Sequence, residues 1–483
     1  MSRPGAAFLA ASLCAASLAT VALGTAAPAP GADDAATRQA APATRQAAPA
    51  ARQGGPAALP RWPDQAGYAL DLAYDARRFA LSGTERIAFT NTGPAPLRSV
   101  WLRAWGNAFG GCRVRRVRVA VTAGGTLAAQ QRDCTALEVR LDRALAPGAR
   151  AAVALRIRVT APARADRFGR FRGAAYFGNA LPLLAVAEAG GWQLPPYTFA
   201  GESFYSLTSS WRVRLRLPRG LRAATTGTQA GPARGGVATF TAPRARDFMI
   251  VAGRFDVRTA RTGTVRVRRF SRPGTHAVIV RRTLGVAVLS MRRYARWYGP
   301  YGRPEVDLVE GPAEVAQGGL AMEYPEIVLT PAEPSAIAHE LAHQWFYGIV
   351  GDDQWREPWL DESFAEFSQA RLPRARVPNR LGGCRMPDGS DVPLDASMAR
   401  MTSGPPGRYV RTAYIGGACF LRAVQRALGP AGFDAFMRRL VADHRDGVLT
   451  TPAFVAAVRA AAPGDGATVD ALLRRTGLLR PGP

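Results

Sequence analysis

Hydrophobic and polar residues alternate one by one through much of the first half of the chain. The clearest alternating runs span residues 68–74, 79–91, 137–141 and 153–159. A period of two is typical of strands that bury one face, and turn-forming residues separate these runs. The pattern therefore predicts a β-sheet domain over residues 61–258, which is a normal size for one domain.

The second half of the chain has a helical pattern instead. Residues 283–298 are largely apolar with arginines toward the end, and Gly299 and Pro300 follow, as expected where a helix stops. Shorter amphipathic segments span residues 433–443, 452–461 and 469–478. We expect residues 259–483 to form a second, mainly helical domain, so that the whole chain has a multi-domain α and β fold.

The first 60 residues differ from both predicted domains. Arg3 precedes an apolar run that ends in small residues, which is typical of a secretory signal peptide, predicted here over residues 1–27. Residues 28–60 repeat Thr-Arg-Gln-Ala-Ala-Pro-Ala and predict a low-complexity Ala/Pro/Arg/Gln linker. Leu13, where a small residue would be needed, makes lipidation of Cys14 the less favoured alternative. We expect a secreted, extracellular protein, or one associated with the cell envelope, with no stable membrane span after signal removal.

All 63 basic residues are arginine, and the formal net charge is +27. Such a charge raises the question of nucleic-acid binding. The arginines, however, are spread along alternating, strand-like segments, and the sequence has no basic helix with interleaved aromatic residues on which bases would stack. We therefore expect no nucleic-acid partner, and a diffuse positive field that suits an anionic envelope.

Residues 335–371 contain the strongest chemical signal in the chain. His339 and His343 are two of only four histidines and lie four residues apart, so a helix would place both imidazoles on one face. Glu340 lies beside them, and eighteen residues separate His343 from Glu362. Two imidazoles and a carboxylate that leave one position for water are typical of a catalytic zinc site. We predict that His339, His343 and Glu362 bind one Zn²⁺, with Glu340 as the general base.

The surroundings of this motif are typical of a packed helix. Pro334 and Ser335 can start it, with Ser335 as the N-cap. Ile337, Leu341 and Trp345 repeat at a spacing of four, as a buried helix face requires. The alternative interpretation is a buried amphipathic helix whose two histidines are only hydrogen-bonded.

The zinc motif also carries a family resemblance. HELAHQWF, followed after eighteen residues by the glutamate of WLDESFAEF, resembles the gluzincin aminopeptidases of the M1 family. Asp361 and Ser363 stand where the family usually has Asn and Gly, and neither position is a ligand in the family. YALDLAYD and FALSGTERIAFTN are similar to the opening strands of the family's first domain. The resemblance implies a saddle-like N-terminal β-sheet domain followed by a mainly helical, thermolysin-like zinc peptidase domain, in a short two-domain secreted form.

A second segment resembles the exopeptidase motif of the same family. Ala321, Met322 and Glu323 match a motif that usually reads Gly-Ala-Met-Glu-Asn, whereas Leu320 and Tyr324 depart from it. The resemblance implies that the three matching residues bind substrate, with Glu323 pairing with the free α-ammonium group. The alternative is an ordinary acidic residue at the end of a strand.

A third block resembles the one that carries the family's catalytic tyrosine. Tyr414 matches Tyr-x-Lys-Gly-Ala, with Gly416 in place of lysine, and the resemblance implies that its phenol donates to the oxyanion. Tyr409, five residues earlier, is the rival. Glu366 lies one helical turn beyond Glu362 and is a candidate to orient a ligand histidine, with simple surface exposure as the alternative.

Four cysteines remain after the predicted signal peptide, which fits export to an oxidising compartment. Four cysteines permit three pairings. Their positions favour Cys112 with Cys134 inside the β-domain, a link worth about 3 kcal/mol. Cys419 lies in an apolar helical run and is expected to be a buried thiol, so no partner is assigned to Cys384.

These features predict a zinc-dependent metallopeptidase, most simply an aminopeptidase that releases N-terminal residues with a metal-activated water. In the family the β-domain adds polar residues to the amino-end pocket, and Glu202 is the one weak candidate here. Two alternatives stay open: a zinc endopeptidase on the same scaffold, and a secreted peptide-binding protein without turnover. The complete ligand set with Glu340 argues against the second. Peptides are the expected partners, and a monomer is the favoured oligomeric state.

Overall fold

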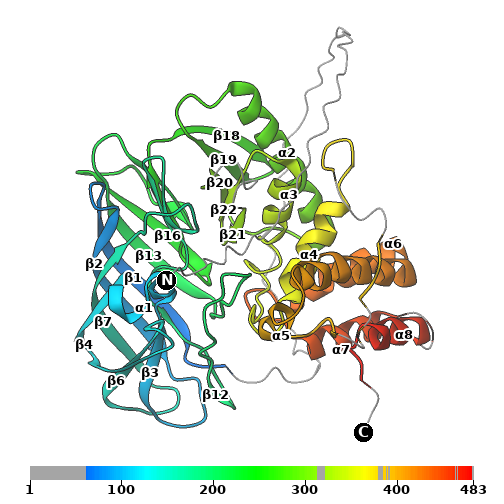
Figure 1. Ribbon diagram of the computed structural model, residues 1–483, viewed down its shortest axis with the longest axis horizontal. Helices are drawn as coiled ribbons and strands as arrows, with labels where there is room; N and C mark the ends of the chain where they lie inside the picture. Colours follow the sequence, from blue (N-terminus) through cyan, green and yellow to red (C-terminus); the bar gives the residue numbers. More distant parts are fainter. Residues whose placement is uncertain are drawn as a thin grey trace, which may run out of the picture.

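The computed structural model has a β-rich half and a helical half that lie side by side (Figure 1). This arrangement confirms the predicted fold class, in which a sheet domain precedes a mainly helical domain. The signal peptide and linker predicted for residues 1–60 lie outside the described part of the chain. The described residues are 61–312, 321–378, 384–387, 389, 392–462, 464 and 466–480.

Two sheets enclose the core of the β-rich half. The larger has the strand order β15-β16-β13-β1-β2-β7-β4, and the smaller has the order β10-β3-β6-β5. Alternate residues of β1 and β13, such as Leu70, Leu72, Val213 and Leu215, are buried in the core that both sheets share. The predicted alternation therefore reflects strands with one face in the core. The strands are β1 (Asp64–Asp75), β2 (Ala80–Thr90), β3 (Leu97–Arg103), β4 (Val117–Ala123), β5 (Gly125–Gln131), β6 (Ala136–Leu145), β7 (Arg150–Thr160), β10 (Leu183–Leu184), β13 (Ser209–Arg216), β15 (Thr228–Gln229) and β16 (Val237–Ala245).

Shorter elements connect these sheets to the helical half. A third sheet has the order β14-β17-β9-β8, and β11 pairs with β12. The phenol of Tyr176 on β9 donates to the backbone oxygen of Glu310 at 3.1 Å, which joins the two halves directly. The short elements are η1 (Trp105–Phe109), α1 (Gly111–Val114), β8 (Phe168–Phe171), β9 (Ala174–Phe177), β11 (Ala187–Glu188), β12 (Gly191–Trp192), β14 (Arg222–Thr225) and β17 (Ile250–Gly253).

The helical half contains one sheet of its own, with the order β18-β19-β20-β22-β21. Because β18 begins at Asp256 and pairs with β19, the chain enters this sheet a few residues before position 259. The strands are β18 (Asp256–Thr262), β19 (Val265–Ser271), β20 (Glu305–Glu310), β21 (Met322–Tyr324) and β22 (Ile327–Thr330). The helices are α2 (Ala277–Tyr298), α3 (Pro334–Ala342), α4 (Trp359–Ala370), α5 (Met398–Thr402), the π-helix Val410–Gly416, α6 (Gly417–Asp443), α7 (Thr451–Ala461) and α8 (Ala467–Arg475).

Aromatic side chains hold α3 and α4 against each other. Trp345 and Trp359 are fully buried. Phe346, just beyond α3, stacks on Phe364 of α4 with ring centroids 4.6 Å apart. Such packing fixes the relative position of the two helices, which carry the residues of the predicted zinc site.

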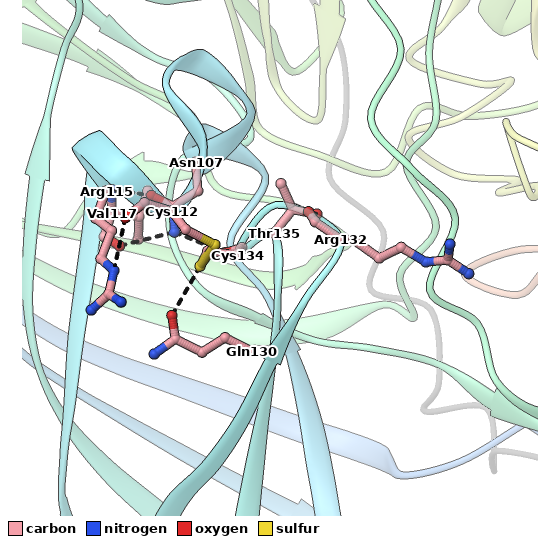
Figure 2. Close-up of a disulfide and its surroundings, with 8 residues drawn as sticks. All are labelled: Asn107, Cys112, Arg115, Val117, Gln130, Arg132, Cys134 and Thr135. Carbon is pink, nitrogen blue, oxygen red and sulfur yellow. Dashed lines mark hydrogen bonds between the residues drawn. A yellow bond between two sulfur atoms is a disulfide. The ribbon is translucent and has the colours of Figure 1, made fainter.

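The Cys112–Cys134 pairing predicted from the sequence is present as a disulfide (Figure 2). Asn107 lies next to it. Its amide nitrogen donates to the backbone oxygens of Val117 and Cys134 at 3.1 and 2.8 Å, and its amide oxygen accepts from the Val117 nitrogen at 2.8 Å. The disulfide and this asparagine together fasten the segment before β4 to the turn between β5 and β6.

The prediction of a free, buried thiol at Cys419 is wrong. Cys419 at the start of α6 forms a disulfide with Cys384, with their Cα atoms 5.5 Å apart. Cys419 is indeed buried in an apolar helix, but burial does not exclude a partner that arrives from a distant loop. The sequence around Cys384, rich in Gly, Pro and Arg, gives no sign of where that loop lies.

None of the helices in the described part of the chain is both long and apolar enough to cross a membrane.

Glu85 is an unusual residue in the core of the β-rich half. It lies on β2 between Leu70 of β1 and Leu155 of β7, and its side chain is fully buried. Neither carboxylate oxygen has a hydrogen-bond partner in the described structure. Burial therefore raises the pKa of Glu85 well above its usual value.

We predict that this carboxyl destabilises the protein increasingly as the pH rises. Below the unfolded pKa of about 4.3 the group is neutral in both states, and above it only the unfolded chain ionises readily, so stability falls. Glu85→Leu should raise the free energy of unfolding by about 1–3 kcal/mol at pH 8 and by less at pH 5. Urea unfolding at both pH values measures the difference from wild type. Glu138→Gln, at a half-buried strand position, is the control, and an equal gain for Glu85→Leu at both pH values would contradict the prediction.

Candidate active site

Helix α3 presents the two histidines of the HELAH motif. His339 lies on its last turn and His343 is its C-cap, and the imidazole ring centroids are 4.9 Å apart. The helix starts two residues earlier than an N-cap at Ser335 would place it. Its N-cap is Glu333, whose carboxylate accepts from the Ser335 nitrogen at 3.3 Å, so the prediction of Ser335 as N-cap is wrong. Pro334 occupies the first turn, where its missing N–H costs nothing.

Helix α4 brings Glu362 to the same point. Its Oε2 atom lies 3.1 Å from Nε2 of His339 and 3.5 Å from Nε2 of His343. One ligand atom from each residue lies within 4.8 Å of the others, and all three side chains are buried. The structure thus brings together the three predicted ligands, and their donor atoms converge as a metal ion would require.

The outer nitrogen of each imidazole also has a partner. His343 Nδ1 lies 3.0 Å from the backbone oxygen of Phe346, and His339 Nδ1 lies 3.3 Å from a carboxylate oxygen of Glu366. Partners of this kind fix the ring and its tautomer, so that Nε2 is left to bind metal. Glu366 is half-buried and in contact with a histidine, so it is not simply a surface residue.

The charges of this cluster depend on one another. Burial disfavours the imidazolium form, but the hydrogen bond with Glu362 and the negative charges of Glu323 and Glu362 together outweigh it and raise the pKa of His343 to about 10. Burial opposes ionisation of Glu362 as well, yet its bonds with both histidines hold its pKa far below the usual range. A metal ion must displace the protons from the histidines in order to bind.

Glu340, on α3, belongs to the same cluster of buried side chains. It is 5% exposed, and its Oε2 atom has no hydrogen-bond partner among the described residues. Burial raises the pKa of Glu340 to about 8, against the opposing effect of the two histidines. A dication bound beside it would lower this value. An unpartnered carboxylate with a pKa near neutrality suits a group that takes up and releases a proton.

Glu323 approaches the histidines from the sheet. It lies at the middle of the edge strand β21 and forms a second group of potential ligand atoms with Glu340 and His343, again within 4.8 Å. Gln354 Nε2 donates to Glu323 at 3.1 Å and to Asp361 at 2.8 Å, which fixes both carboxylates.

The other two residues of the exopeptidase-like segment lie less directly in the site. Met322 is 6% exposed and belongs to a hydrophobic cluster between the two halves. Ala321 is half-buried, immediately before β21. They directly precede Glu323 along the chain and so help to place it beside Glu340 and His343.

Two tyrosines reach Glu362 from the π-helix and the residue before it. Tyr414 donates to Oε1 of Glu362 at 2.5 Å and stacks on His339 at 5.6 Å. Tyr409 lies 3.4 Å from the same oxygen. The structure therefore brings both sequence candidates into the site, with the Tyr414 phenol closer to Glu362.

The β-rich half contributes a buried ion pair to this cluster. Arg167 donates to Glu202 Oε1 at 2.6 Å, and Glu202 Oε2 accepts from Tyr409 at 3.3 Å. Burial, opposed by Arg167, raises the pKa of Glu202 to about 7. Glu202 had only a weak signal in the sequence. Arg167 and Gln354 had none, since no spacing relates them to the zinc motif.

Comparison with known proteins agrees with this geometry. Residues 332–475 match the family model described as "Peptidase family M1 domain". Tricorn protease-interacting factor F2 of Thermoplasma volcanium is 35% identical over 99 residues, which cover 17% of this chain and 12% of that protein. Human aminopeptidase B is 28% identical over 171 residues, which cover 31% and 26%. The matches thus span only a small part of these longer relatives.

Solved structures cover far more of the chain. The M1 zinc metallopeptidase of Deinococcus radiodurans is 21% identical, with a TM-score of 0.60, over 87% of this chain and 95% of that one. A two-domain M1 zinc metallopeptidase variant bound to L-arginine is 20% identical, with a TM-score of 0.62, over 88% and 95%. At this identity the likeness concerns the fold. Residues 332–475 therefore form a peptidase family M1 domain, within a chain that has the two-domain fold of the M1 zinc metallopeptidases.

Proposed function

We propose that the protein is a zinc-dependent aminopeptidase that hydrolyses N-terminal residues from peptides. The observation that carries the proposal is the convergence of three functions in one cluster of buried side chains. A metal-ligand set, an unpartnered carboxylate on Glu340 and an anionic anchor on Glu323 all lie around His343. The M1 domain match and the aminopeptidase names of the relatives support the same reaction.

The donor atoms suit zinc. Two imidazole nitrogens and one carboxylate oxygen are a common catalytic zinc set, whereas Mg²⁺ and Ca²⁺ prefer oxygen ligands alone. His339, His343 and Glu362 would hold the ion. When bound, zinc supplies Lewis-acid chemistry, because it lowers the pKa of water and polarises the scissile carbonyl.

Glu340 acts as the general base and then as the general acid. Its Oε2 atom takes a proton from the attacking water and passes it to the leaving amine. This oxygen has no hydrogen-bond partner among the described residues, and burial to 5% exposure limits its contact with bulk water. Tyr414 donates its phenolic proton to the oxyanion that forms on the substrate carbonyl.

Glu323 limits the reaction to the end of the chain. Its buried carboxylate attracts the α-ammonium group, and Gln354 keeps it in place at 3.1 Å. A cation bound at Glu323 lies next to Glu340, so the first peptide bond falls near the general base. A blocked amino terminus offers no charge and would leave Glu323 buried without a counter-ion.

Export and the monomeric state belong to the same proposal. The apolar run within residues 1–27 has the pattern of a signal peptide, and two disulfides suit an oxidising compartment. The protein would then act outside the cell or at the cell envelope, on peptide substrates. Size-exclusion chromatography with light scattering tests the monomer.

The first prediction concerns the metal and the general base. Glu340→Gln should lower kcat by about 10²–10⁴-fold and retain zinc, because it removes a proton acceptor but no ligand. His339→Ala should lose both zinc and activity. Hydrolysis of amino-acid arylamides and zinc content by mass spectrometry measure the two effects. Chelators should abolish wild-type activity and added zinc should restore it. An active Glu340→Gln variant would refute the mechanism.

The second prediction concerns the free amino group. Glu323→Gln should lower kcat/KM for unblocked substrates by about 10- to 100-fold, as expected for the loss of one charge-assisted hydrogen bond. Amino-terminally acetylated versions of the same peptides should be poor substrates for both proteins. If wild type cleaves acetylated and free peptides equally well, the protein is an endopeptidase instead.

A further inference from the structure

The two carboxylate oxygens of Glu362 have different surroundings. Oε2 faces the imidazoles of His339 and His343, at 3.1 and 3.5 Å. Oε1 faces the two phenols, with Tyr414 at 2.5 Å and Tyr409 at 3.4 Å. One oxygen is therefore turned toward the metal position, and the other depends on tyrosine hydroxyl groups for hydrogen bonds.

Tyr414 has two acceptors for its phenolic proton in the proposed reaction, Glu362 and the oxyanion. A phenol has one proton and is protonated at neutral pH. Tyr414 cannot donate that proton to Glu362 and to a substrate oxyanion at once. When it turns to the oxyanion, Oε1 of the metal ligand loses its closest donor, and Glu362 is so buried that an unpaired carboxylate oxygen is costly.

Tyr409 is placed to take over this hydrogen bond. It is 7% exposed, whereas Tyr414 is only half-buried and thus more accessible to a substrate. Its ring packs against Gly201, where a Cβ atom would lie 2.6 Å from Cε1 of the tyrosine. Glu202, held by Arg167 at 2.6 Å, accepts from the same phenol at 3.3 Å. A phenol has one proton, so Tyr409 donates to Glu202 while Tyr414 serves Glu362. When Tyr414 turns away, Tyr409 can turn its proton to Glu362, because Glu202 keeps its bond with Arg167.

The π-helix explains why both phenols reach one oxygen. In an α-helix, residues five apart point about 140° away from each other, at 3.6 residues per turn. In a π-helix the backbone bonds run from residue i to residue i+5, which brings such residues onto one side. The π-helix Val410–Gly416 directly follows Tyr409, and the two rings meet edge to face at 5.4 Å. π-helical turns often occur at functional sites.

We propose that Tyr409 is a positioning residue that keeps Oε1 of Glu362 hydrogen-bonded while Tyr414 donates to the oxyanion. The inference rests on the proposed aminopeptidase function for the role of Tyr414. In the resting protein either phenol can serve Glu362. During the reaction only Tyr409 can, so the two tyrosines replace one another in metal retention but not in catalysis.

A double-mutant cycle on zinc affinity tests the first half of this statement. Tyr409→Phe, Tyr414→Phe and the double variant each lose hydroxyl groups and keep the rings, so the packing is conserved. Each single variant should bind zinc within about threefold of wild type, because one donor remains. The double variant should bind zinc about 10- to 100-fold more weakly, as is typical when a metal ligand loses the hydrogen bond to its non-coordinating atom. Competition with a chromogenic chelator measures these affinities without any turnover.

Steady-state kinetics test the second half. Tyr414→Phe should lower kcat by about 10²–10³-fold, through loss of the oxyanion donor. Tyr409→Phe should lower kcat by about tenfold with unchanged KM and nearly unchanged zinc affinity, because its hydroxyl is needed only after Tyr414 has turned. Tyr298→Phe is the matched control, since this buried phenol bonds to Ser368 at 2.7 Å. It should leave kcat and zinc affinity unchanged.

Each arm has an outcome that overturns the inference. The zinc measurements overturn the inference if the fold-loss of zinc affinity in the double variant is no more than the product of the fold-losses in the two single variants. The kinetic arm does so if Tyr409→Phe keeps wild-type kcat, or if it raises KM alone, as a substrate-binding tyrosine would. Wild-type protein that binds zinc without cleaving peptides would instead refute the proposed function, and the zinc arm would still show whether the two hydroxyls replace one another.

Discussion

Buried negative charge around Glu362 is the constraint on which the rest of this site depends. Glu202, Glu323, Glu340, Asp361 and Glu362 are all at most 6% exposed. Carboxylates so close together and so dry cannot all be ionised without cations or donors nearby. Within the described chain, Arg167 forms a direct ion pair with only one of them, at 2.6 Å. A zinc ion and a substrate ammonium group are the kinds of cation that would balance the others.

The same constraint explains why the site needs both halves of the molecule. The helical half supplies most of the negative charge and both histidines, but Arg167 and Glu202 come from the β-rich half. Asn179 of that half also accepts from the phenol of Tyr324, the residue after Glu323, at 3.0 Å. A cation for the site and a support for the edge strand thus come from the β-rich half. Without that half, the site would lose Arg167 and the hydrogen bond that Asn179 accepts beside Glu323.

The sequence predicted those parts of the site that are close together along the chain. His339, Glu340 and His343 lie on one helix, and Glu362 follows on the next, so their spacing alone brings their chemistry together. Glu323 and Tyr414 were predicted only through a family resemblance. Neither local spacing nor the family resemblance predicts the contact between Glu202 and Tyr409, which are 207 residues apart in the sequence.

The errors in the sequence analysis have the same origin. The partner of Cys419 comes from a loop whose position no local pattern gives. The N-cap of α3 was misplaced because two oxygen-bearing residues, Glu333 and Ser335, flank Pro334, and only the backbone angles decide between them. The fold class was easier to predict, because alternation and helical spacing are local sequence patterns that directly reflect which residues face the core.

Ser363 shows how a departure from the family motif becomes part of the structure. This serine stands where the motif usually has glycine, directly after Glu362. Its hydroxyl donates to the backbone oxygen of Ala413 at 2.6 Å, within the π-helix that sets the two phenols side by side. A Cβ atom at Gly417 would lie 1.7 Å from that hydroxyl, so the serine requires a glycine opposite it. The pair ties the helix of the metal ligand to the helix of the oxyanion donor, and a change at either position should disturb both at once.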